Sequence, residues 1–75
     1  MDYSLLGKYI HERRKELGLT LNKFAMLNDV EPAVLSRIEN NHQGVKIKTL
    51  ENIVKGFNQT IAEFLSDFEA QDNFQ

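Results

Sequence analysis

The 75-residue chain contains no cysteine and no tryptophan, and Pro32 is its single proline. Without cysteine, neither disulfide bonds nor a thiolate metal site can hold the fold together. His11 and His42 lie too far apart in the sequence to suggest a metal site, and no H-E-x-x-H motif is present. We therefore expect no metal and no cofactor, and a fold that depends on its hydrophobic core.

The chain also lacks a long hydrophobic run. No apolar stretch approaches the roughly 18 residues that would span a membrane, and no signal-peptide pattern opens the sequence. These features predict a cytoplasmic protein without a membrane partner. A hydrophobic content of 41% over 75 residues is enough for one compact core, but not for two domains or a deep substrate cavity.

Two short helical patterns flank a turn in the middle of the chain. Thr20 can cap a helix that ends near Leu27, and Asn28-Asp29 can then break it by adopting a left-handed backbone. A second helix can begin at Pro32, because proline suits the first helical position. The inward apolar positions of the two helices are Phe24, Ala25, Leu27, Leu35 and Ile38, while Ala33, Ser36, Arg37 and Asn40 lie on other faces. This layout is typical of a DNA-reading helix-turn-helix.

Three more helices are predicted around this pair. Gly18 is expected to end the first, and a Thr60–Glu63 capping box to start the last. In between, a helix over residues 46–57 contains Gly56, which suggests a close helix neighbour, and Asn58 is expected to end it in a left-handed conformation. The apolar positions are Leu6, Tyr9, Ile10 and Leu17 in the first of these three helices, Ile47, Leu50, Ile53, Val54 and Phe57 in the second, and Ile61, Phe64, Leu65 and Phe68 in the third. We predict an all-α bundle of five helices, with a domain over residues 1–68 and a frayed tail over residues 69–75.

The charge is small but unevenly distributed. Residues 1–59 hold all nine basic side chains against seven acidic ones, whereas residues 60–75 hold four acids and no base. A basic end that faces DNA and an acidic far end are compatible with this pattern. A mixed, solvated surface would explain the same charges, so charge does not decide the function.

The order of motifs resembles the phage repressor/Cro-type helix-turn-helix family, also called the XRE family, over about residues 5–66. The motifs are Gly18-Leu-Thr, Phe24-Ala25, the run from Leu35 to Asn40 (Leu-Ser-Arg-Ile-Glu-Asn) and Thr49-Leu50. The resemblance implies a lambda-repressor-like domain, bacterial or phage-encoded, that regulates transcription as a repressor. It also implies a homodimer that places its third helix in the major groove of a near-palindromic double-stranded operator.

The resemblance further assigns roles to individual residues. Base-reading positions would be Pro32, Ala33, Ser36 and Arg37, and phosphate-contacting positions would be Asn22, Lys23, Asn40, Asn41, His42, Lys46 and Lys48. Arg37 is the best equipped, because its planar guanidinium can donate two hydrogen bonds to a guanine edge. The alternative for Arg37 is a solvated side chain that pairs with Glu39 or another neighbour.

Two structural roles come with the family likeness. Arg14 and Glu39 fall where the family often places an ion pair between its first and third helices. Dimer contacts could come from the fifth helix, for which the candidates are Ile61, Phe64, Leu65 and Phe68. For Phe64 and Leu65, we expect burial in the core of the single chain.

The chain departs from the family pattern at three places. Leu21 replaces a common glutamine, and Asn28-Asp29 replaces an apolar residue followed by glycine. The third helix opens with Glu31-Pro32-Ala33, which puts a carboxylate near the expected phosphates and removes the usual polar readers. A protein-interaction module on the same fold, such as an antitoxin or anti-repressor component, therefore remains the alternative function. Enzymatic activity is not expected. Glu12 and Glu16 lie one helical turn apart and could suggest a catalytic carboxylate pair, but Arg13 and Lys15 lie among them, which is typical of a solvated surface.

Overall fold

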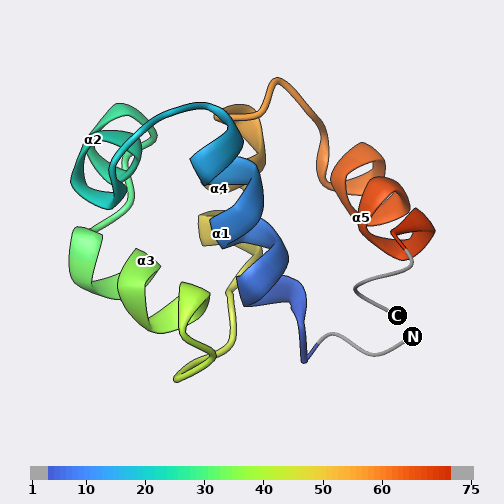
Figure 1. The fold of residues 1–75 in the computed structure, drawn as a ribbon, viewed down its shortest axis with the longest axis horizontal. Helices are drawn as coiled ribbons and strands as arrows, with labels where there is room; N and C mark the ends of the chain where they lie inside the picture. The colour runs from blue at the N-terminus through green and yellow to red at the C-terminus, as the bar shows by residue number, and fades with distance from the viewer. Residues whose placement is uncertain (1–3, 72–75) are drawn as a thin grey trace.

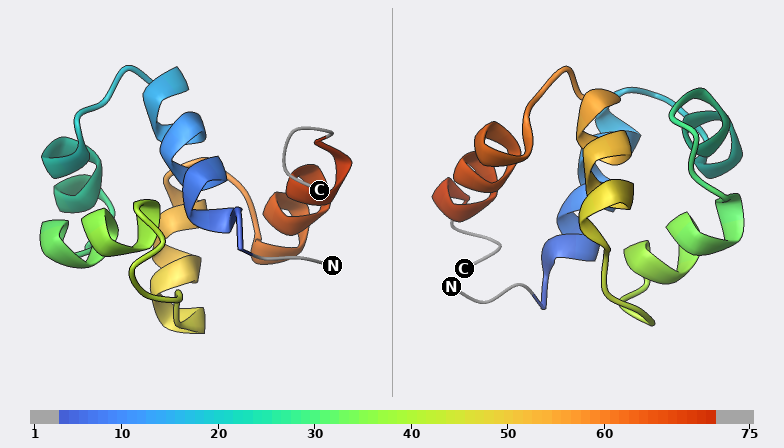
Figure 2. Two further views of the ribbon diagram at one scale, coloured as in Figure 1. Left: turned by 60° about the horizontal axis from the view of Figure 1, so that its bottom comes forward. Right: turned by 180° about the vertical axis from the view of Figure 1, so that it is seen from behind.

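The computed structural model describes residues 4–71, and all regular secondary structure in that range is α-helical. The helices are α1 (Leu6–Glu16), α2 (Leu21–Leu27), α3 (Pro32–Glu39), α4 (Ile47–Lys55) and α5 (Ile61–Ala70). Figure 1 shows α1 and α4 in the centre, with α2 and α3 on one side and α5 on the other. The two further views in Figure 2 show the same arrangement. The predicted five-helix, all-α fold is confirmed for the described residues.

The predicted helix ends are largely confirmed. The Thr20 side chain accepts a hydrogen bond from the Lys23 amide at 3.1 Å and so caps α2. Thr60 and Glu63 form the expected capping box at the start of α5, with reciprocal hydrogen bonds of 2.8 and 3.1 Å. Gly18 directly follows the C-cap of α1, and Asn58 lies in the turn after α4; both have the expected positive φ angles, 72° and 58°. Local sequence signals therefore set the starts of α2 and α5 and the turn that follows α1.

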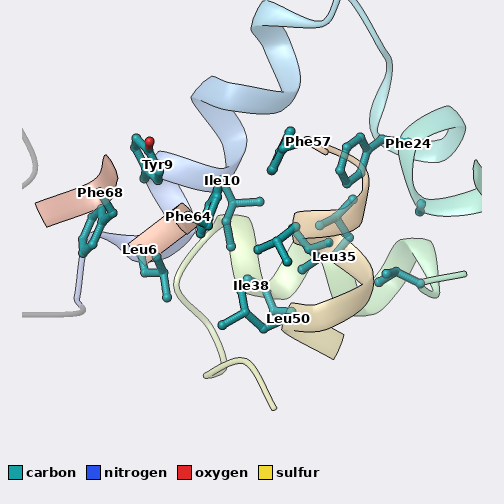
Figure 3. Packing of buried hydrophobic residues seen from close by; sticks show 14 residues of the cluster. Leu6, Tyr9, Ile10, Phe24, Leu35, Ile38, Leu50, Phe57, Phe64 and Phe68 are labelled. Carbon is teal, nitrogen blue, oxygen red and sulfur yellow. The ribbon is translucent and has the colours of Figure 1, made fainter. Parts of the chain in front are cut away.

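A row of aromatic rings joins the two sides of the molecule. Tyr9 of α1 lies between Phe64 and Phe68 of α5, with ring centroids 5.1 and 5.2 Å apart. Phe57, which follows α4, stacks on Phe64 at 5.5 Å and meets Phe24 of α2 at 5.1 Å. Figure 3 shows these rings beside the aliphatic side chains of the same cluster. Pairs at such distances add to the energy of burial, so the row ties α5 to the helix-turn-helix side.

Three apolar positions that the helical period placed inward are exposed. Leu17 is 48% exposed, Leu27 is 62% exposed and Ile47 is 68% exposed. Each lies at a helix end: Leu17 directly follows α1, Leu27 is the last residue of α2 and Ile47 is the first of α4. The apolar stripe therefore continues beyond the part of each helix that its neighbours cover.

The ends of α4 and α5 also differ from the prediction. α4 stops at Lys55, so Gly56 caps the helix instead of lying within it. A Cβ atom on Gly56 would lie 2.7 Å from the Asn28 side chain, so the close neighbour is that side chain and not a helix backbone. α5 continues to Ala70, so the first two residues of the expected tail are helical, whereas residues 72–75 lie outside the described range.

Candidate nucleic-acid interface

The inner face of α3 packs closely against α1. Leu35 and Ile38 are buried in the core. Gly7 of α1 is also buried, and a Cβ atom at this position would overlap the backbone carbonyl oxygen of Ile38. The two helices can approach this closely only because position 7 has no side chain. Sequence reasoning missed this role, although a glycine inside an otherwise regular helix was a usable signal.

A buried ion pair fastens the end of α3 to α1. Arg14 donates from Nε and Nη2 to the two carboxylate oxygens of Glu39 at 2.8 and 2.9 Å, and from Nη1 to the Leu19 carbonyl oxygen at 2.8 Å. The Nδ1 atom of His11 lies 2.7 Å from the same carboxylate. The structure thus contains the pair expected between these helices, with His11 as a partner that the sequence did not reveal.

The electrostatics of this cluster favour the charged forms of Glu39 and Arg14. Burial by itself raises the pKa of Glu39, but the hydrogen bonds from Arg14 and His11 outweigh burial, so the pKa of Glu39 lies below its usual value. The hydrogen bond to Glu39 raises the pKa of Arg14, against the opposing effect of burial. The cluster therefore acts as a fixed structural link that holds α3.

The outer face of α3 carries the predicted base-reading residues. Pro32, Ala33 and Arg37 are exposed, whereas Ser36 is half-buried. Arg37 does not pair with Glu39. Its Nε atom donates to the side-chain oxygen of Gln43, in the loop that follows α3. Three of the four residues are therefore exposed on α3, and Gln43 is a neighbour of Arg37 that the sequence did not single out.

The predicted phosphate-contacting residues are all exposed and fall into three groups along the chain. Asn22 and Lys23 lie in the first turn of α2, three more directly follow α3, and two lie at the start of α4. The group that follows α3 consists of Asn40, Asn41 and His42, and the group at the start of α4 consists of Lys46 and Lys48. The side chain of Asn40 donates to the Ser36 carbonyl oxygen at 2.8 Å, so this amide is already engaged with the backbone.

The opposite end of the molecule is acidic. α5 carries Glu63, Asp67 and Glu69 and contains no lysine or arginine. Figures 1 and 2 place α5 on the other side of α1 and α4 from α2 and α3. The uneven charge of the sequence therefore corresponds to a spatial separation, with the acidic helix far from the outer face of α3.

The residues that depart from the family pattern still make the turn. Asp29 adopts a left-handed conformation with a φ of 56°, as the usual glycine would. The Asn28 side chain donates to the Phe24 carbonyl oxygen at 2.8 Å and occupies the space that Gly56 leaves open. Asp29 and Asn28 thus form the turn between α2 and α3 without the glycine and the apolar residue of the family pattern.

Burial divides the four dimer candidates of α5, and for Phe64 it is the burial that the sequence predicted. Phe64 and Phe68 are fully buried in the aromatic row, so neither offers a surface to a second copy. Ile61 and Leu65 are half-buried. The prediction of a buried Leu65 is wrong, because this side chain lines an apolar groove of about 370 Å³ together with Leu6 and Ile47. Of the four candidates, Ile61 and Leu65 are the two with accessible surface.

Among residues 4–71, no group of three or more His, Asp or Glu side chains lies close enough together to hold a metal ion. No helix in the same range is long and apolar enough to cross a membrane.

Comparisons with known proteins agree with this geometry. A helix-turn-helix family model matches residues 10–64. The chain is 30% identical over 69 residues to the HTH-type transcriptional regulators PuuR of Escherichia coli (strain K12) and of Shigella flexneri. These alignments cover 92% of this chain but 37% of each regulator, so the chain spans little more than a third of their length. No solved structure matches significantly. Because the family match extends from α1 into α5, the chain belongs to the helix-turn-helix family of the phage repressor/Cro (XRE) type.

Proposed function

We propose that the chain is a DNA-binding transcriptional regulator that places α3 in the major groove of its operator. One observation carries this proposal: α3 is fixed to α1 along its inner face and exposes Arg37 and Ala33 on its outer face. A rigid helix with an exposed polar face is what reading in the groove requires. The names of the two regulators that the chain resembles support the same class of function.

Each exposed residue of α3 would contribute differently. Arg37 would donate two hydrogen bonds to a guanine edge, worth about 1 to 3 kcal/mol of discrimination against other bases. Ala33 would contact a thymine methyl group, and Pro32 would contribute shape. The surrounding lysine and amide side chains would bind phosphates, which position the protein without reading sequence. Sequence preference would therefore depend mainly on one side chain.

Two copies acting together would give a longer site. A homodimer would present its two α3 helices about one helical turn, or 34 Å, apart, so the operator would be nearly palindromic. The exposed Ile47 and the half-buried Leu65 and Ile61 are the apolar residues that could bury surface between copies. A dimer bound to such a site in the promoter of a bacterial or phage gene would repress transcription of that gene. The protein would act in the cytoplasm.

A protein-interaction module is the second candidate function. Met26 and Leu27, at the end of α2, are 73% and 62% exposed, and Glu31 lies exposed just before α3. Exposed apolar side chains and a carboxylate are better suited to contact with a partner protein than to contact with the phosphate backbone of DNA. On this hypothesis, binding would bury Met26 and Leu27 and would depend little on salt.

Fluorescence anisotropy with labelled duplexes distinguishes the two candidates. Duplexes tiled across the region upstream of the protein's own gene, and a duplex selected from a randomised library, would be titrated at low and moderate salt. We expect tight binding to at least one duplex, a steep loss of affinity with salt through counterion release, and a further loss in Arg37→Ala. Lys55→Ala is the matched control, because this exposed lysine lies at the opposite end of α4 from Lys46 and Lys48.

The outcomes separate clearly. Equal losses in Arg37→Ala and Lys55→Ala would show that only net charge matters, and would contradict base reading by α3. Flat anisotropy on every duplex at low salt, with no enrichment in the selection, would overturn the regulator proposal. A pull-down with Met26→Lys as the control would then test the protein-interaction module.

A further inference from the structure

Gln43 lies beside Arg37 because of the way the chain turns after α3. Asn41 adopts a left-handed conformation with a φ of 60°, and the His42 amide donates to the Arg37 carbonyl oxygen at 2.8 Å. This turn brings the Gln43 side chain back to Arg37, where its Oε1 atom accepts the hydrogen bond from Nε. Gln43 is half-buried and lines the apolar groove beside Gly44 and Val45. The acceptor residue is therefore more buried than Arg37, which is exposed.

The chemistry of this contact leaves the base-reading donors free. A guanidinium has five N–H groups, and the contact uses the one on Nε. The N–H groups of Nη1 and Nη2 remain available for an acceptor pair. The Gln43 oxygen carries no formal charge, so Arg37 keeps its full positive charge for DNA. A carboxylate at position 43 would hold Nε equally well but would cancel that charge.

We propose that Gln43 is a positioning residue that sets Arg37 to read a base through its two terminal nitrogens. This inference rests on the proposed DNA-binding function and adds a residue to it. A free arginine must lose the rotational freedom of a long side chain when it binds, whereas one held at Nε has already lost part of it. Gln43 also disfavours the alternative geometry, in which Nε itself donates to the base.

The first test uses the protein without DNA. In ¹⁵N NMR spectra, we expect the Arg37 Nε–H of the wild type to exchange slowly with water and to have a distinct chemical shift. Gln43→Ala should make this group exchange at the rate of a solvated arginine. Gly44→Ala is the control in the same loop, because an added Cβ atom there meets no other atom within 4 Å. A fast-exchanging Nε–H in the wild type would overturn the inference.

The second test is a double-mutant cycle with a duplex selected from a randomised library and a scrambled duplex. Loss of one hydrogen bond should weaken binding of Gln43→Ala to the selected duplex by about fivefold and leave binding to the scrambled duplex unchanged. In an Arg37→Ala background, Gln43→Ala should have no further effect. Gln43→Glu should keep the slow Nε–H exchange but weaken binding to both duplexes.

The possible failures differ from one another. A loss in Gln43→Ala that persists in the Arg37→Ala background would mean that Gln43 contacts DNA directly, which would overturn positioning. Wild-type preference for the selected duplex, with no change in Gln43→Ala, would reject the role of Gln43 and keep the regulator proposal. A wild type without preference between the two duplexes would remove the regulator proposal, and the inference with it.

Discussion

The two faces of α3 are held in very different ways. On the inner face, Leu35 and Ile38 are buried, the backbone lies against Gly7, and Glu39 is paired with Arg14. On the outer face, Ala33 and Arg37 are exposed, and Arg37 makes one side-chain hydrogen bond. A helix of eight residues thus combines a fixed side with a solvent-facing side.

This difference separates folding from recognition. Eight residues are too few for a helix to be stable alone, so α3 must obtain its order from the inner face. The outer face is then free to vary without loss of the fold. Substitutions on the inner face should therefore lower the free energy of unfolding, whereas substitutions on the outer face should change binding.

The largest expected effect is the loss of one partner of the buried ion pair. Arg14→Met leaves the Glu39 carboxylate without its main donor in a buried site, which should lower the free energy of unfolding by about 3 to 5 kcal/mol. Glu39→Leu should cost a similar amount by stranding Arg14. Urea unfolding followed by circular dichroism measures both losses.

Replacement of both partners is the matched control for this prediction. An Arg14→Met, Glu39→Leu double variant leaves no buried charge unpaired, so we expect it to recover most of the stability that either single variant loses. Additive losses in the double variant would show that the two side chains act independently, and the link between α1 and α3 would need another explanation.

The next largest effect is expected at Gly7. Alanine is the better helix former by about 1 kcal/mol, so propensity alone would make Gly7→Ala stabilising. The added Cβ atom overlaps the Ile38 carbonyl oxygen, and relief of the overlap requires α1 and α3 to move apart. We expect a net loss of about 1 to 3 kcal/mol in urea unfolding. Gly44→Ala is the control, and an equal change in both variants would contradict close packing at Gly7.

Acid should weaken the inner face selectively. The pKa of Glu39 in the folded protein lies below its ordinary value of 4.5, because its hydrogen bonds outweigh burial. Its contribution to stability is therefore complete above pH 4.5 and is lost as the pH falls through the lower, folded pKa. Glu39→Gln should flatten the loss of stability over that pH range, as measured by urea midpoints. An unchanged pH profile would show that other carboxyl groups control acid unfolding.

The sequence predicted most of the local structure. Helical period, the Thr20 and Thr60 caps and the left-handed residues Gly18 and Asn58 are encoded within a few residues of where they act. The helical spacing of apolar residues predicted burial wrongly at three helix ends. Leu17, Leu27 and Ile47 continue the apolar stripe but are exposed, because coverage depends on which neighbouring element reaches that point. Tertiary packing, and not the local sequence pattern, decides whether an apolar side chain at a helix end is buried.

The same limit applies to the candidate site. The family resemblance supplied Arg37 and the Arg14–Glu39 pair, but it could not show that His11 joins that pair or that Gln43 reaches Arg37. Both contacts join residues whose distance depends on a turn or on helix packing. Gln43 in particular lies within reach only because Asn41 takes a left-handed conformation. The roles of the residues on the outer face remain predictions until binding is measured.

The smallest expected effect on stability is at Arg37, where the contrast with the inner face is most direct. This side chain is exposed and its only described hydrogen bond is to Gln43, so Arg37→Ala should change the free energy of unfolding by no more than about 0.5 kcal/mol. Arg14→Met, which removes the positive charge of α1 that pairs with Glu39 on the inner face, is the matched comparison in the same urea experiment. A loss in Arg37→Ala above about 1 kcal/mol would show that the outer face also supports the fold, because surface substitutions rarely cost that much. A near-zero change would mean that any loss of DNA binding in this variant reflects the contact itself, since the protein that binds is still fully folded.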